Sequence, residues 1–110
     1  MTVQFVGLQQ VEPIEAEGLK GIAERYAAKL QRTVKDEILL IVDIKAHRKA
    51  GKRSKYTFKL ALRAPTKTIE ASASEWEIAL AFRMACTALE REMEHKLHSD
   101  EHRDKHRKKY

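Results

Sequence analysis

Residues 55–63 read KYTFKLALR and show the clearest two-residue alternation in the chain. Every second position is apolar, at Tyr56, Phe58, Leu60 and Leu62. Three of the alternate positions are cationic, at Lys55, Lys59 and Arg63. Because successive side chains of a strand point to opposite faces, this pattern predicts a strand with one face in the core and one cationic face.

The flanking segments extend this strand into a sheet. Residues 38–48 are apolar and β-branched at first and then alternate, and residues 69–74 alternate small apolar with polar side chains. A shorter segment, 2–8, is apolar at two positions of one face. The basic stretch 49–54 contains Gly51, which predicts a turn. We therefore expect four strands, with a basic hairpin joining the second and the third.

Two other segments have helical periodicity. Apolar residues recur at three- and four-residue steps over 14–33, and Pro13 suits the first turn of a helix. That stripe consists of Leu19, Ile22, Ala23, Tyr26, Ala27, Leu30 and Val34. The segment 74–77, SEWE, fits a capping box and predicts a second helix that begins at Ser74. The apolar stripe of this second helix consists of Ile78, Phe82, Ala85, Leu89 and Met93.

The order β-α-β-β-β-α predicts an α+β fold, a two-layer sandwich of a four-stranded sheet with two helices on one face. A length of 110 residues with 43% apolar residues suits one core, so we expect a single domain over residues 1–98. Residues 99–110 lack apolar periodicity and predict a frayed helix end or a flexible charged tail. No apolar run is long enough to cross a bilayer, and residues 1–8 carry no basic leader, so we expect a cytoplasmic location.

The positive charge of the chain is concentrated in one quarter of the sequence. The chain has 22 Lys and Arg against 16 Asp and Glu, a formal charge of +6. Nine of the basic residues, and none of the acidic ones, lie between Ile44 and Ile69, so 13 basic and 16 acidic residues remain elsewhere. Concentrating like charge costs self-repulsion, which favours a polyanionic partner over a merely solvated face.

The predicted RNA-binding residues are therefore those of the basic segment. They are Lys45, His47, Arg48, Lys49, Lys52, Arg53, Lys55, Lys59, Arg63 and Lys67. The arginines are suited to bidentate phosphate contacts, and about six phosphate contacts would weaken binding roughly a thousandfold from about 50 to about 200 mM salt. As secondary RNA contacts we expect four basic residues of the helices, Lys20, Lys29, Arg83 and Arg91.

The element order, the chain length and the passage 69–74, IEASAS, which leads from a strand into the second helix, together show a resemblance to a known family. Over roughly residues 2–97 the chain resembles the short ribosome hibernation-promoting factor and ribosome-associated translation inhibitor family. The resemblance implies a cytosolic, non-catalytic factor that binds the small ribosomal subunit and its rRNA and blocks the sites of messenger and transfer RNA. Glutamates on the second helix, where the family is usually basic, shift the expected rRNA contacts toward the hairpin.

Two other classes of function remain open. A general RNA-binding domain is one, because double-stranded RNA-binding domains have the similar order α-β-β-β-α. Those domains place a lysine cluster at the start of the last helix, where this chain has Glu75 and Glu77. A basic protein-interaction module, such as a weak homodimer formed through an exposed strand edge, is the other. We expect a monomer or weak homodimer, with neither a membrane nor a small molecule as partner.

The sequence contains no pattern that indicates catalysis. There is no Gly-rich phosphate loop and no nucleophile motif, so we expect neither enzyme activity nor a cofactor. Cys86 flanks the second apolar stripe and is interpreted as a buried, inert residue. Four histidines, His95, His98, His102 and His106, would share a face if the last helix continued through the tail. No carboxylate or thiolate set completes a closed site around them, so they are only a weak metal candidate.

Overall fold

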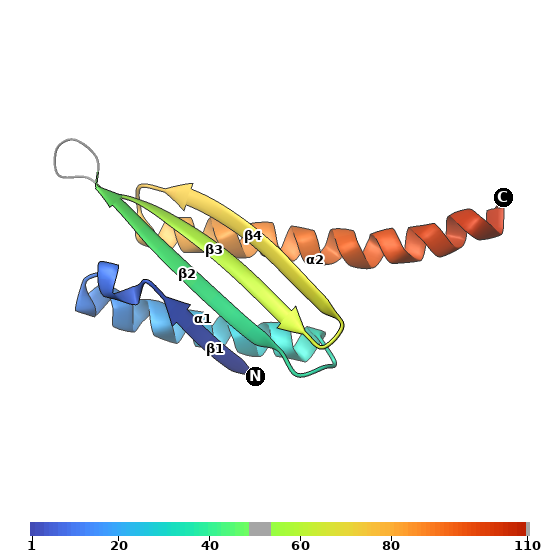
Figure 1. Ribbon diagram of the computed structural model, residues 1–110, viewed down its shortest axis with the longest axis horizontal. Coiled ribbons are helices and arrows are strands. Elements are labelled where there is room, and N and C mark those ends of the chain that lie inside the picture. The colour runs from blue at the N-terminus through green and yellow to red at the C-terminus, as the bar shows by residue number, and fades with distance from the viewer. Residues whose placement is uncertain (49–53, 110) are drawn as a thin grey trace.

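The predicted order of elements is confirmed in the computed structural model of the chain (Figure 1). The structure describes the backbone of residues 1–48 and 54–109 and the side chains of this part through Lys96. Its elements are β1 (Thr2–Val6), a short 3-10 helix η1 (Leu8–Gln10), α1 (Pro13–Thr33), β2 (Leu39–Arg48), β3 (Ser54–Ala64), β4 (Lys67–Glu75) and α2 (Ile78–Lys109).

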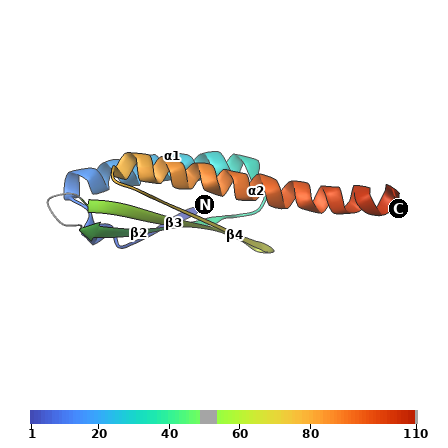
Figure 2. The same ribbon diagram turned by 90° about the horizontal axis from the view of Figure 1, so that it is seen from above.

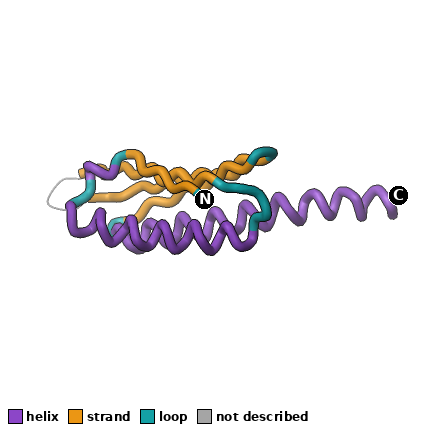
Figure 3. Tube along the Cα trace, turned by 90° about the horizontal axis from the view of Figure 1, so that it is seen from below, coloured by secondary structure: helices purple, strands orange, loops and turns teal. Residues whose placement is uncertain are grey.

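The four strands form one mixed sheet in the order β1-β2-β3-β4. β1 pairs with β2 in parallel, and the crossover between them is made by α1, whereas β2, β3 and β4 pair antiparallel. Both helices lie on the same side of the sheet, as views from above and from below show (Figures 2 and 3). No described element covers the other side, which we call the open face. The predicted two-layer α+β sandwich is therefore correct.

The core lies between the sheet and the helices and is built from the alternate positions predicted for the strands. Phe58 and Leu60 of β3 are fully buried, and the ring of Phe58 meets that of Phe82 from α2 edge to face at a centroid distance of 5.5 Å. Ala27 of α1 and Leu89 of α2 are also fully buried. Burying a large side chain of this kind stabilises the fold by about 1.5–3 kcal/mol, so the alternation of β3 decides which face of the sheet is covered.

One residue of the apolar stripe predicted over residues 14–33, Ile22, is not buried. Ile22 is 43% exposed, whereas the neighbouring Ala23 is completely buried. Ile22 lines a groove between α1 and α2 and does not pack under the helix, because it lies at the margin of the apolar stripe.

The predicted capping box at residues 74–77 is wrong. β4 continues through Glu75, and the Ser74 hydroxyl is hydrogen-bonded to that of Thr57 at 2.8 Å, across the strand pair. The backbone N–H of Ala81 donates to the carbonyl oxygen of Glu77, so α2 begins three residues later than Ser74 would have set it. Pairing with β3 competes with capping for the same residues, and the longer ladder prevails.

The first strand is shorter than predicted because the chain turns at Gly7. This residue has a φ of +83°, and a Cβ at this position would collide with the carbonyl oxygen of Ile44. The chain then forms η1, from which the Gln10 side-chain oxygen accepts a hydrogen bond from the Ala46 N–H at 2.9 Å. Near the hairpin, the Gln10 side chain thus supplies the hydrogen bond to β2 that a longer β1 would have made.

The last helix extends far beyond the sheet (Figure 1). The backbone of residues 99–109 continues α2, and the division between a domain ending at 98 and a flexible tail remains a prediction. Within the part of the chain that the structure describes, no helix combines the length and the apolar character needed to cross a membrane.

Candidate nucleic-acid interface

The strand alternation places half of the predicted RNA-binding residues on the open face. Each of them occupies a strand position that alternates with the positions facing the helices, and all lie in β2 or β3. They are Lys45, His47, Lys55, Lys59 and Arg63. The sheet therefore presents cations from two adjacent strands on one uncovered surface.

The cross-strand register makes the hairpin end of the open face cationic. His47 lies opposite Lys55, and in the next row Lys45 lies opposite Thr57, which pairs with Ser74. These rows contain no acidic residue, and among the described residues no ion pair engages Lys45 or Lys55. We call the residues Lys45, His47, Lys55, Thr57 and Ser74 the cationic end. Ammonium groups beside hydroxyls offer several donors to phosphate oxygens.

The acidic residues of the open face lie farther from the hairpin. Asp43 is opposite Lys59, and the carboxylate of Glu70 in β4 is 3.5 Å from the Lys59 ammonium. Both side chains of this ion pair are exposed, but Glu70 still gives Lys59 a partner within the protein that competes with external anions. Lys59 is thus less available to an external anion than Lys45 or Lys55.

The remaining predicted residues of the basic segment are dispersed. Arg63 is exposed on the open face but lies at the opposite end of β3, in a row with Leu39 and Thr68. Arg48 and Lys67 are exposed at strand ends in the alternate register, opposite Ser54 and Ala64 respectively, and so do not belong to the open-face rows. The predicted residues Lys49, Lys52 and Arg53 lie outside the described residues.

An aromatic residue adjoins the cationic end, and sequence reasoning missed it. Trp76 directly follows β4, and continuing the β3–β4 register by one step places it opposite Lys55. The Lys55 ammonium lies 5.7 Å from the centroid of the Trp76 ring, within the range of a cation–π interaction. The signal was present in the alternation of residues 69–75, which continues past the assumed start of the helix. Phe58 is fully buried on the helix side, as predicted, and Tyr56 is partly buried there against the core.

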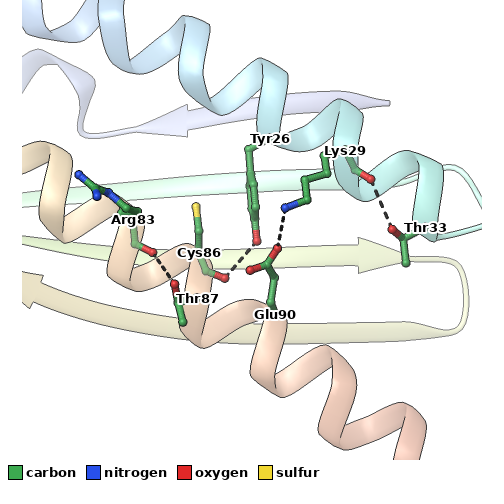
Figure 4. Close-up of polar contacts among 7 residues, drawn as sticks. All are labelled: Tyr26, Lys29, Thr33, Arg83, Cys86, Thr87 and Glu90. Atoms are coloured by element: carbon green, nitrogen blue, oxygen red, sulfur yellow. Dashed lines mark hydrogen bonds and ion pairs between the residues drawn. The ribbon is translucent and has the colours of Figure 1, made fainter.

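The four secondary residues lie in the helix layer, on the far side of the sheet from the open face. The Lys20 ammonium is 3.6 Å from the Glu17 carboxylate, and the Lys29 ammonium is 3.4 Å from that of Glu90 (Figure 4). Arg83 and Arg91 are exposed on α2. A flat RNA surface cannot touch both layers at once, so a role for these residues requires RNA that wraps around the protein, and it remains a prediction.

Two of the polar contacts shown in Figure 4 join α1 to α2 across the groove between these helices. The groove has a volume of about 340 Å³, and the hydroxyl of Tyr26, which lines it, donates to the backbone oxygen of Cys86 at 3.1 Å. Burial, with a smaller contribution from the Glu90 carboxylate, raises the pKa of the Cys86 thiol to about 12. Burial also raises the pKa of Tyr26. A thiol that stays protonated is a poor nucleophile, which agrees with the interpretation of Cys86 as inert.

The described side chains contain no group of three or more His, Cys, Asp or Glu able to hold a metal ion. His95 is exposed near the end of this region. The side chains of His98, His102 and His106 lie outside the described residues, so the candidate formed by the four histidines is not tested.

Comparison of the chain with protein-family models gives no match, and comparison with curated proteins gives no significant match. The surface chemistry of the open face is therefore the basis on which a function is inferred.

Proposed function

We propose that the protein is a ribosome-binding translation inhibitor that contacts the rRNA of the small subunit through the open face. The observation that carries the proposal is the placement of Lys45, Lys55 and His47 together on the uncovered side of the sheet, away from acidic partners. The resemblance of residues 69–74 to the hibernation-factor family supports the choice of the ribosome as the source of that RNA.

The mode of action that fits this surface is steric. A sheet with a filled core is a rigid support, and its lysines bind phosphates as point charges, each contact releasing condensed counterions. No covalent step is involved. A bound protein occupies the surface that messenger or transfer RNA requires, and it leaves again when salt or a competing RNA displaces it.

Co-sedimentation with purified small subunits at low salt tests the proposal. The wild-type protein is expected in the subunit fraction, and the double variant Lys45→Gln/Lys55→Gln is expected to remain in the supernatant with an unchanged circular dichroism spectrum. The matched control is Arg25→Gln/Lys35→Gln, which removes the same charge from exposed positions off the sheet and should bind like the wild type. Failure of the wild type to co-sediment contradicts the proposal.

The same experiment separates the other two classes. Equal affinity for a free RNA duplex and for small subunits indicates a general RNA-binding domain. Association that does not weaken with salt indicates a protein-interaction module, since contacts to phosphate lose affinity steeply as salt rises.

A further inference from the structure

The side chain of Trp76 is positioned by two neighbouring elements. β4 ends at Glu75, whose partner in β3 is Tyr56, and α2 begins at Ile78. The backbone N–H of Trp76 donates to the Glu75 carboxylate at 3.0 Å. The ring is therefore presented at the hairpin end of the sheet, and 37% of the residue remains exposed.

The chemistry around this ring combines the two features that nucleotides require. The Lys55 ammonium lies over the ring at 5.7 Å, and His47 is the cross-strand partner of Lys55 in β2. Lys45 occupies the next row along the open face. A nucleobase can stack on a ring of this kind in place of the Lys55 ammonium, and Lys55 and Lys45 can then neutralise the phosphates on either side of that base.

We infer that Trp76 and Lys55 form a stacking site for an unpaired nucleobase, with Lys45 holding an adjacent phosphate. This inference deepens the proposed function and rests on it. A base within a duplex is already stacked on both sides, so the site selects loops, bulges or single strands over regular helices. The partner is thus an RNA segment with at least one base turned out of its stack.

The alternative occupant of an exposed aromatic ring is an apolar side chain of another protein. The cationic surroundings disfavour it, because burying Lys55 and Lys45 against an apolar surface removes their hydration without supplying an anion. A nucleotide supplies both a base that stacks on the ring and phosphates that bind the ammonium groups.

The experiment uses the intrinsic fluorescence of Trp76, which is the one tryptophan of the chain. The full-length protein is titrated at low salt with single-stranded oligoadenylate and, separately, with a blunt RNA duplex of equal length. Stacking predicts saturable quenching by the single strand and weak quenching by the duplex. Binding without any change in fluorescence overturns the inference, as does equal quenching by both RNAs.

Two variants complete the test through a labelled RNA. Trp76→Ala should weaken binding of the single strand by about 5- to 150-fold, the effect of removing one stacking platform, and should change duplex binding by less than about twofold. Trp76→Phe keeps an aromatic ring and should retain most of the affinity, which separates stacking from a general loss of structure. If Trp76→Ala does not fold, Trp76→Phe and the fluorescence titration of the wild type still test the stacking site.

The outcomes distinguish the two proposals. Loss of single-strand binding in Lys45→Gln/Lys55→Gln together with unchanged binding in Trp76→Ala overturns the stacking site and leaves the open face as the RNA surface. Absence of any RNA binding by the wild type overturns both.

Discussion

The salt dependence of RNA binding gives the most quantitative prediction for the open face. Each phosphate neutralised by Lys or Arg adds about 0.9 to the slope of log affinity against log salt on a duplex. Three open-face cations, Lys45, Lys55 and Arg63, take part in no ion pair among the described residues, whereas Lys59 pairs with Glu70. The triple variant Lys45→Gln/Lys55→Gln/Arg63→Gln should therefore reduce the slope by about 2.7. Between about 50 and about 200 mM salt, the affinity of the triple variant should therefore fall by a factor roughly 40 times smaller than that of the wild type.

Fluorescence anisotropy of a labelled RNA duplex across this salt range measures the slope directly. Arg25→Gln/Lys35→Gln is the control and should keep the wild-type slope. Lys59→Gln should reduce the slope by less than Lys45→Gln, because Glu70 already competes for Lys59. An unchanged slope in the triple variant, or an equal reduction in the control, would refute the assignment of the phosphate contacts to the open face.

Three predictions concern the scaffold. Gly7→Ala should destabilise the fold by at least about 1–2 kcal/mol in a urea titration, because the left-handed backbone disfavours a Cβ that would also strike Ile44; wild-type stability would contradict this. Gln10→Ala leaves the Ala46 N–H without its acceptor and should cost about 1 kcal/mol and accelerate amide exchange at Ala46; unchanged exchange would argue against the hydrogen bond. Because burial raises the pKa of Cys86 from 9.0 to about 12, the folded state keeps a proton that the unfolded state loses, so the free energy of unfolding should fall as pH rises above about 9. Between pH about 8 and about 10.5, the free energy of unfolding of Cys86→Ala should fall less than that of the wild type. An equal fall in both proteins would show that Cys86 does not contribute.

The faces of the strands were predictable because alternation is a local property. Leu60 and Phe58 are buried as expected, and Lys55 points to the open side, since one residue of a strand sets the direction of its neighbours. The number and order of elements follow from the same patterns. The parallel pairing of β1 with β2 follows in turn from the connecting helix, which needs a crossover rather than a hairpin.

The boundary between β4 and α2 was not predictable from the pattern alone. The residues from Ser74 to Glu77 satisfy both a capping box and a continued strand, and the choice depends on Thr57, which is 17 positions away from Ser74. Taking the helix to begin at Ser74 assigned Trp76 to its first turn and concealed its place beside Lys55. The local pattern fits both a strand and a capped helix, and the pairing with β3 that decides between them is non-local.

The sequence also located the basic segment but not the charge balance on the surface. Glu70 lies just outside that segment, yet the antiparallel register of β3 and β4 brings its carboxylate to Lys59. Alternation likewise separates Arg48 from its neighbour His47. Among the described residues, fewer cations lie on the open face without an ion pair than the basic segment has in its sequence.

Chemical probing of the rRNA in purified small subunits tests the central claim most directly. With wild-type protein at low salt, we expect protection of nucleotides that line the sites of messenger and transfer RNA. With Lys45→Gln/Lys55→Gln at the same concentration the protection should disappear, while Arg25→Gln/Lys35→Gln should preserve it. Absence of protection by the wild type, or undiminished protection by Lys45→Gln/Lys55→Gln, would contradict binding of the small subunit through the open face.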